Sequence, residues 1–305
     1  MKILMVGLFT GNPFDGDETL AFGFEALGHK ITKINYRKTP FINVRLPFIA
    51  KPYDLIIIGK GEAIWPITLA KIKVPKIFWY GDQRQDVQSW VVNRAKHCDL
   101  FLHTTSGQRL KEYQQSIKRP AAFFMVPCQA SLYPSLNKYK NDVFFSGSPL
   151  SKLGDSVRNE VLNELDQLNN FKWAGKIPST VLKGHAYGNE IVQSKISVSI
   201  NHFNSFYKYN SDRIIHYACG GFVLAYDVPG MNELFQHIPT FKTVNELKEK
   251  INYYLKNESE RDALRSKIIT ETKQKYNGKQ MAMYILDCLA TGRSKLYPQF
   301  EQYPE

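Results

Sequence analysis

Short apolar runs alternate with helix-length segments along almost the whole chain, and this alternation leaves few folds open. Several runs, such as Leu55–Ile58, are apolar at every position rather than at every second one. Strands of that kind, separated by helices, are typical of a parallel sheet covered on both faces. The first half is therefore predicted to be a doubly wound α/β domain. Its predicted strands are Lys2–Leu8, Lys30–Tyr36, Asp54–Ile58, Lys76–Tyr80, Asp99–His103 and Ala122–Val126.

The pattern restarts after Pro127–Asp142, a stretch with two prolines and little periodicity that reads as a linker. A chain of 305 residues fits two domains of ~150 residues each. We predict an α/β domain over residues 1–135, a second over 136–278, and a helix and tail over 279–305 that returns to the first domain. Strands are expected at Val143–Ser146, Phe171–Ala174, Ile196–Ile200, Phe222–Ala225 and Thr240–Phe241, and helices at Val157–Leu168, Ser211–Cys219, Val244–Leu255, Ser259–Lys275 and Lys279–Leu289.

Composition narrows the class of protein. No apolar run approaches the ~18 residues that cross a bilayer, and the N-terminal Met1–Gly7 reads as a buried strand because it lacks a small-residue cleavage site. The four cysteines form no C-x-x-C pair and are far apart, which predicts neither a zinc site nor a disulfide framework. We therefore expect a cytoplasmic protein in a reducing compartment.

The formal net charge of +12 is the outlier of the composition. It predicts attraction to polyanions such as nucleic acid, an anionic membrane surface or phosphorylated small molecules. The alternative is that the excess of lysine only keeps the protein soluble.

Polar loops that follow predicted strands are the first candidate sites, because ligands of open α/β sheets bind beyond the carboxyl ends of the strands. Gly7–Asn12 contains Gly11, whose lack of a side chain admits a ligand close to the backbone or simply permits a tight turn. The glycine spacing is not G-x-G-x-x-G and no acid ends the second strand, so a nicotinamide cofactor is disfavoured. Asp15-Gly16-Asp17 spells a D-x-D that either binds a metal or, through Asp17, caps the next helix.

Two side chains at strand ends are candidate catalysts. Asp82 follows the run Lys76–Tyr80 and is placed to take a proton from an attacking hydroxyl, or only to cap a helix. His103 ends the next strand along the chain and is a second candidate.

The most informative segment runs from Asn201 to Glu233. A helix carrying Arg213 ends on Gly220-Gly221, a buried strand follows, and the turn Pro229-Gly230 opens another helix. Such a turn presents backbone N–H groups as an anion site. The planar, always charged guanidinium of Arg213 suits a diphosphate.

This segment resembles the donor-binding signature of GT-B glycosyltransferases, most closely the group-1-like proteins related to the spore-maturation protein CgeB. The family pattern has an arginine with a glutamate three residues later, then an alanine, a glycine pair and a leucine, followed by a glycine turn, E-L-F and a later E-R pair. Residues within the segment and after it match this order. The resemblance implies two Rossmann-like domains facing a cleft, with the donor in the second. The matching residues are Arg213, Ala218, Gly220, Gly221, Leu224, Gly230, Glu233, Leu234, Phe235 and Glu260-Arg261, with looser matches at Phe144–Ser148 and Ser194–Asn201.

The resemblance implies that the donor site includes residues of both predicted domains. It also implies that the protein itself holds no metal. Two departures stand out: His216 occupies the place of the family glutamate, and Lys208 replaces an earlier acid. His216 either hydrogen-bonds the donor or packs on the helix, and Glu233 is the remaining acid placed to meet the ribose. The implied donor-site residues are Gly11, Gly147, Ser148, Asn201, Arg213, His216, Gly230, Met231, Asn232 and Glu233.

The predicted function is transfer of a hexose or pentose from a nucleotide sugar, UDP- or GDP-linked, to a hydroxyl acceptor. The net charge makes DNA with hydroxylated bases one candidate acceptor. Precursors of surface polysaccharide or glycolipid, with peripheral membrane contact, are the other. A protein that binds nucleic acid on a transferase fold without catalysis is the alternative from another class.

Overall fold

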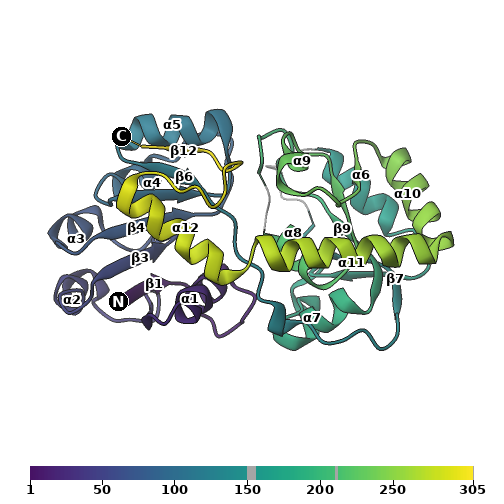
Figure 1. Cartoon of the computed structure of the whole chain (residues 1–305), viewed down its shortest axis with the longest axis horizontal. Helices are drawn as coiled ribbons and strands as arrows, with labels where there is room; N and C mark the ends of the chain where they lie inside the picture. The colour runs from purple at the N-terminus through teal and green to yellow at the C-terminus, as the bar shows by residue number, and fades with distance from the viewer. Residues whose placement is uncertain (150–155, 210–211, 305) are drawn as a thin grey trace. The chain divides into compact units, whose positions relative to one another are not determined.

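The computed structural model describes residues 1–149, 156–209 and 212–304. The chain divides into two compact units (Figure 1). The first unit comprises Met1–Pro127, Phe206–Lys208 and Gly278–Glu305, and the second comprises Cys128–Ser205 and Tyr209–Asn277. No helix in the described ranges combines the length and the apolar character that a bilayer crossing requires.

The first unit is built on a seven-stranded sheet in the order β12-β6-β5-β4-β3-β1-β2. Six strands are parallel, with Ile3 opposite Leu55 and Ile57 opposite Ile77 in the register, and all six were predicted from the sequence. The seventh, β12, pairs antiparallel with β6 and was not predicted. The strands are β1 (Lys2–Gly7), β2 (Lys30–Asn35), β3 (Leu55–Gly59), β4 (Lys76–Tyr80), β5 (Leu100–His103), β6 (Ala121–Phe123) and β12 (Gln302–Tyr303).

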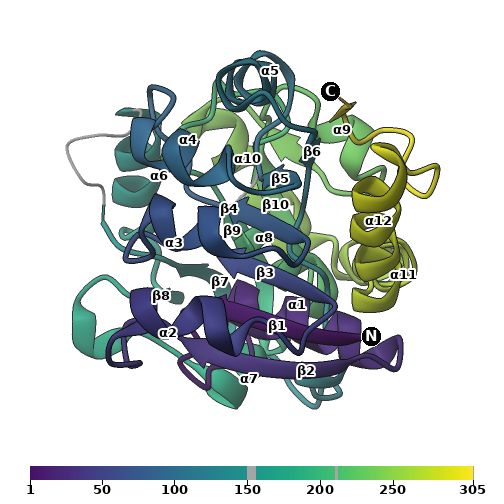
Figure 2. The same ribbon diagram turned by 90° about the vertical axis from the view of Figure 1, so that its left-hand side faces the viewer.

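Helices flank this sheet on both faces (Figures 1 and 2). The C-terminal helix α12 crosses α1 at two glycines, where a Cβ on Gly23 would lie 2.5 Å from the carbonyl oxygen of Gly278. Backbones can approach this closely only where side chains are missing. The helices are α1 (Gly16–Ala26), α2 (Ile42–Ile49), α3 (Pro66–Lys71), α4 (Ser89–Ala95), α5 (Gly107–Ile117) and α12 (Gly278–Thr291).

The second unit contains a five-stranded parallel sheet in the order β11-β10-β9-β7-β8. Its strands are β7 (Asn141–Ser146), β8 (Phe171–Ala174), β9 (Ser194–Ser199), β10 (Val223–Tyr226) and β11 (Thr240–Phe241). Its helices are α6 (Ser156–Leu165), α7 (Gly184–Val192), α8 (Asp212–Gly220), α9 (Met231–Leu234), α10 (Val244–Lys256) and α11 (Glu258–Lys275), with short 3₁₀ turns at Ala130–Leu132 and Pro178–Thr180. The predicted start of α8 at Ser211 lies outside the described residues.

One expectation about the cysteines is wrong. Cys128 and Cys219 form a disulfide with a Cα–Cα distance of 6.0 Å, while Cys98 and Cys288 are free and buried. The two bonded residues are 91 positions apart in the sequence. Spacing along the chain did not show that the fold brings them together, so the cysteine argument for a reducing compartment fails.

Candidate functional site

The carboxyl edge of the second sheet carries a pair of arginines. Arg213 extends from α8 toward the ends of β7 and β9, where its Nε donates to the Ser146 carbonyl at 2.6 Å and its Nη1 to the Ile200 carbonyl at 2.9 Å. The guanidinium also lies over the Phe145 ring, 4.9 Å from its centroid. Arg213 is therefore fixed where an α/β sheet binds ligands.

The second arginine, Arg158 on α6, was not predicted. It is 1% exposed, its Nη1 donates to the same Ile200 carbonyl at 3.0 Å, and its Nη2 donates to the Ser148 carbonyl at 2.8 Å. Its Nε has no hydrogen-bond partner, and no carboxylate forms an ion pair with it among the described residues. Burial, and then the nearby charge of Arg213, lower the pKa of Arg158 to about 9. Burying a cation without a counter-ion costs free energy. This indicates that an anion binds beside Arg158.

Helical spacing could have revealed Arg158. It lies three, four and seven positions before Val161, Leu162 and Leu165, all of which are buried. Residues so spaced share one helix face. Charged neighbours in the sequence made this part of α6 resemble a solvent-facing stretch.

The loop after β7 is shaped to receive Arg213. Gly147 has φ 147°, and a Cβ at this position would lie 2.8 Å from Arg213 Nη2. Ser146 is held by Tyr217, whose hydroxyl accepts from the Ser146 N–H at 2.7 Å and lies 3.0 Å from its Oγ. The Ser146 Oγ is also 3.1 Å from the Tyr187 hydroxyl. These bonds fix the backbone that accepts from the arginine.

His216 and Asn201 lie beside this pair. His216 is buried, its ring lies edge-on to Tyr187, and burial together with Arg213 lowers its pKa to about 3, so the ring is neutral near pH 7. Asn201 is also buried, and its Nδ2 donates to the Tyr209 carbonyl at 3.1 Å. Its backbone N–H donates to the side chain of Asn204 at 3.0 Å, so Asn201 folds the loop after β9.

The predicted glycine turn precedes the short helix α9. Gly230 has φ 79°, Met231 is buried, and Asn232 and Glu233 are exposed. The N–H groups of Met231 and Glu233 donate to Val228 and Gly230 within the chain, at 3.0 and 3.2 Å. The exposed side chains therefore offer more to a ligand than these two backbone groups do.

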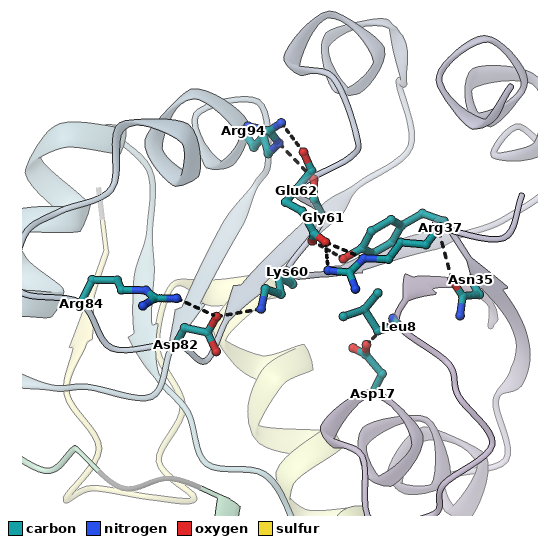
Figure 3. Close-up of polar contacts among 11 residues, drawn as sticks. Leu8, Asp17, Asn35, Arg37, Lys60, Gly61, Glu62, Asp82, Arg84 and Arg94 are labelled. Carbon is teal, nitrogen blue, oxygen red and sulfur yellow. Dashed lines mark hydrogen bonds and ion pairs between the residues drawn. The ribbon is translucent and has the colours of Figure 1, made fainter. Parts of the chain in front are cut away.

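Asp82 lies at the carboxyl edge of the first sheet, within a group of cations (Figure 3). Its carboxylate is 2.8 Å from Lys60 Nζ and 3.9 Å from Arg84 Nη2, and its side chain is 42% exposed. Lys60 follows β3, the neighbour of β4 in the sheet, and has φ 58°. The sequence did not indicate Lys60, because only the strand order brings it beside Asp82.

The loop after β3 is held by a second group of charges (Figure 3). Glu62 accepts from Arg37 Nε at 2.7 Å and from the Tyr36 hydroxyl. Arg94 Nη2 donates to the Glu62 carbonyl at 2.7 Å, and its Nε donates to that of Ile64 at 2.8 Å. This network fixes the left-handed backbone that carries Lys60.

Asp17 does not cap α1, contrary to prediction. Its Oδ2 accepts from the Leu8 N–H at 2.7 Å and its Oδ1 from Trp79 Nε1 at 3.0 Å, so the carboxylate points into the unit (Figure 3). Burial raises its pKa to about 6. Asp15 instead accepts from Asn12 Nδ2 at 2.8 Å and from Thr10. The D-x-D residues thus hold the loop after β1, where Gly11 adopts φ 84°. Among the described residues no group of three or more His, Cys, Asp or Glu could hold a metal ion.

His103 lies in the core rather than in an open site. It is 1% exposed and packs 5.0 Å, between centroids, from the Tyr113 ring. Its Nδ1 accepts from the Thr105 N–H at 2.9 Å, and its Nε2 has no partner. Burial, and then Arg109, lower its pKa to about 3. This environment favours Asp82 over His103 as a proton acceptor.

These two sheets, with candidate residues at their carboxyl edges, define a GT-B fold. Two solved structures share this fold over 95% of this chain. Anabaena Alr3699/HepE with UDP and glucose has a TM-score of 0.62 and 14% sequence identity, and 100% of that chain is covered. The DNA-modifying enzyme β-glucosyltransferase, solved with and without uridine diphosphoglucose, has a TM-score of 0.59 and 12% identity, and 99% of that chain is covered. The T4 phage enzyme with UDP and Mn²⁺ is similar as well, with a TM-score of 0.55, 12% identity and 99% of that chain covered.

Within this fold, residues 158–287 match the family model described as glycosyl transferase-like. The matched range includes both Arg158 and Arg213. None of the curated proteins compared with the chain by sequence is a significant match.

Proposed function

We propose that the protein transfers a sugar from a nucleoside-diphosphate sugar to a hydroxyl acceptor, and that the donor binds at the arginine pair of the second unit. The observation that carries the proposal is the buried Arg158, which has no carboxylate partner among the described residues and shares an acceptor with Arg213. Both lie where ligands of parallel sheets bind. An anion supplied by the ligand completes the charge balance.

A diphosphate fits this place better than a single carboxylate. The half-buried guanidinium of Arg213 can present N–H donors to phosphate oxygens. Arg158 is buried and adds positive charge beside them. The fold shared with structures solved with UDP supports a uridine nucleotide. GDP is the second candidate, and a hexose or a pentose is the transferred group.

Other donor contacts follow from the positions of the remaining residues. Glu233 is an exposed acid after the glycine turn and is proposed to accept from the ribose hydroxyls. The loop of Gly147 and Ser148 lies against the diphosphate, while Asn201 and neutral His216 shape the wall behind it. In this assignment the arginines stabilise the negative charge that the leaving diphosphate gains.

Asp82 is the proposed base. As a partly exposed carboxylate at the edge of the first sheet it can take the proton of an acceptor hydroxyl as the oxygen attacks the anomeric carbon. The bond from that carbon to the donor phosphate breaks, and the nucleoside diphosphate leaves with the electron pair. Lys60 and Arg84 place positive charge beside the same carboxylate.

The acceptor is proposed to carry negative charge. Residues 1–127 hold 18 of the 40 lysines and arginines but only 10 of the 28 aspartates and glutamates. DNA with hydroxylated bases and lipid-linked saccharides both meet this requirement. One enzyme of this fold, β-glucosyltransferase, modifies DNA, which supports the first.

The test is release of UDP from UDP-glucose, and of GDP from GDP-mannose, by the purified protein. Acceptors are a duplex with 5-hydroxymethylcytosine, the same duplex without it, and a lipid-linked saccharide. We expect release to depend on one acceptor class and to disappear in Arg213→Ala. With DNA as acceptor, turnover falls steeply as salt rises.

Nucleotide binding separates the enzyme from the non-catalytic alternative. UDP, GDP, CDP, ADP and NAD are compared by thermal unfolding, where a ligand at a hundred times its dissociation constant adds about 2.7 kcal/mol of stability. Stabilisation by one nucleoside diphosphate supports the transferase. DNA binding without stabilisation by any nucleotide would overturn the proposal in favour of a nucleic-acid-binding protein.

A further inference from the structure

Five large apolar side chains are exposed together on α2 and α3 of the first unit. Their exposed fractions run from 58% to 81%, unusual for a cluster of this size on a soluble surface. The two helices lie side by side in both views (Figures 1 and 2). We call this cluster the apolar patch; its members are Phe41, Val44, Phe48, Trp65 and Ile67.

The patch on α2 follows helical periodicity. Val44 and Phe48 are four positions apart on α2 and therefore share one face. Phe41 stands directly before the helix. The opposite face, with Ile42 and Leu46, is already buried against the unit. A helix apolar on both faces is usually covered on both. One face of α2 is left for a partner.

Hydrogen bonds make the patch one surface rather than two. Asn43 Nδ2 donates to the Ala63 carbonyl at 3.0 Å, and its Oδ1 accepts from the Trp65 N–H at 2.7 Å. The Asn43 carbonyl accepts from the Thr68 hydroxyl at 3.0 Å. These bonds attach the start of α2 to the start of α3, so the apolar side chains of both helices keep their relative positions.

Within the two segments that carry the patch, every charged side chain is a cation, and Glu62, just before the second segment, is paired with Arg37. No aspartate or glutamate occurs between residues 38 and 53 or between residues 63 and 81. Lys51 Nζ lies over the Phe48 ring, 5.2 Å from its centroid. The exposed cations of the two segments are Lys38, Arg45, Lys51, Lys71 and Lys73.

We propose that the apolar patch and its cations bind the surface of a bilayer that contains anionic lipid. Apolar side chains that enter the headgroup region, with lysine and arginine around them, bind such surfaces, and tryptophan is enriched at that depth. A second copy of the chain fits less well, because pairing the patch with itself would bring cation against cation. DNA would leave the aromatic and aliphatic side chains without apolar contacts.

The proposal is independent of the proposed function, although a protein held at a bilayer would favour a lipid-linked acceptor over DNA. It is tested by flotation with vesicles of phosphatidylcholine alone and with 30% phosphatidylglycerol. We expect binding to the anionic vesicles only, with a blue shift in tryptophan fluorescence that Trp65→Phe removes.

Two double variants separate the contribution of the apolar side chains to vesicle binding from that of the cations. Phe41→Asn with Phe48→Ser removes apolar area, and asparagine tolerates the left-handed backbone of residue 41, φ 53°. Arg45→Gln with Lys51→Gln removes two cations and should lower vesicle partitioning by ~10-fold or more. Ile177→Ser with Val181→Ser, two exposed apolar residues of the second unit, is the matched control and should bind as the parent does.

A cooperative thermal unfolding transition, measured on every variant, shows that each is folded. Absence of vesicle binding by the parent protein overturns the proposal. Equal loss of binding in the control variant does so as well. Concentration-dependent dimerisation that the patch variants abolish, without vesicle binding, would assign the patch to a second copy of the chain instead.

Discussion

Arg158 and Arg213, from two different helices, donate to one acceptor, the carbonyl oxygen of Ile200, at 3.0 and 2.9 Å. Sharing an acceptor brings two like charges together at the edge of the sheet, and the pKa of Arg158 is lowered in part by Arg213. Such an arrangement is unfavourable without an anion. We therefore interpret the arginine pair as a binding site for an anionic ligand. Its like charges lower the stability of the protein without that ligand.

Replacing Arg158 should abolish nucleotide binding while changing the free energy of unfolding only slightly. In Arg158→Met the buried charge disappears together with two hydrogen bonds, and these effects oppose one another. We expect the free energy of unfolding to change by less than about 1 kcal/mol, while stabilisation by the nucleoside diphosphate is lost. Thermal unfolding with and without nucleotide measures both quantities.

Arg261 provides the matched control. It is equally buried, but its Nε lies 3.1 Å from the carboxylate of Asp262. Arg261→Met removes that ion pair and the hydrogen bond from Nη1 to the Tyr254 carbonyl, while Asp262 keeps its hydrogen bond from the Tyr139 hydroxyl. This variant should destabilise the protein by about 1 kcal/mol or more, with nucleotide binding retained. Full nucleotide stabilisation in Arg158→Met would contradict the assignment.

Gly147→Ala should weaken donor binding because its Cβ would meet Arg213 Nη2 at 2.8 Å and displace it. Gly28 also has a positive φ, 82°, but an added Cβ meets no atom within 4 Å. Gly28→Ala therefore measures the backbone strain alone, about 1 kcal/mol. A titration of nucleotide by calorimetry should show at least ~10-fold weaker binding only for Gly147→Ala, equivalent to about 1.4 kcal/mol. Equal affinities in both variants would exclude a role for the Gly147 loop.

Most of the fold could be predicted, because long apolar strands carry their own signal. Leu55–Gly59 is buried at every position, as a strand of a covered parallel sheet must be. The strand β12 has only two residues, Gln302 and Tyr303, and exists through its pairing with β6. A segment that short has no periodicity to detect.

The candidate site was less accessible to sequence reasoning. Arg213 stands in a recognisable motif, and its position at the sheet edge follows from the strand before it. Arg158 and Lys60 stand in no motif, and their places depend on tertiary packing and strand order. The disulfide between Cys128 and Cys219 likewise depends on contacts between segments far apart in the sequence.

His103 should lower the stability of the first unit in mild acid, against the opposite contribution of Asp17, whose pKa is raised to about 6. The pKa of His103 is about 3 in the folded protein and 6.5 as the ordinary value, so the unfolded chain binds more protons between those values. Falling pH in this window therefore favours unfolding, by up to about 1.4 kcal/mol per pH unit. Urea unfolding between pH 7.5 and 4.5 measures the slope. His103→Leu should reduce it by that amount, and an unchanged slope would contradict the buried, neutral ring.

Reduction of the disulfide should destabilise the second unit. Cross-linking residues 91 apart restricts the unfolded chain and typically adds about 2–4 kcal/mol. Cys128→Ser should lose the same amount, and its stability should no longer respond to dithiothreitol. Cys98→Ser, at a free buried cysteine, is the control that keeps the response. Peptide mapping without reductant that finds both thiols free would contradict the bond.

Asp82→Asn should abolish most of the sugar transfer. The amide cannot accept the proton of the acceptor hydroxyl, so kcat should fall by about 10²–10⁴. Nucleotide stabilisation should persist, because the arginine pair belongs to the second unit. Asp86→Asn, at an exposed acid four residues later, should leave kcat unchanged.

Lys60→Met keeps the carboxylate and should lose less activity than Asp82→Asn. Breaking the exposed ion pair should alter the free energy of unfolding by no more than about 1 kcal/mol. Full activity in Asp82→Asn would transfer the role of base to another residue.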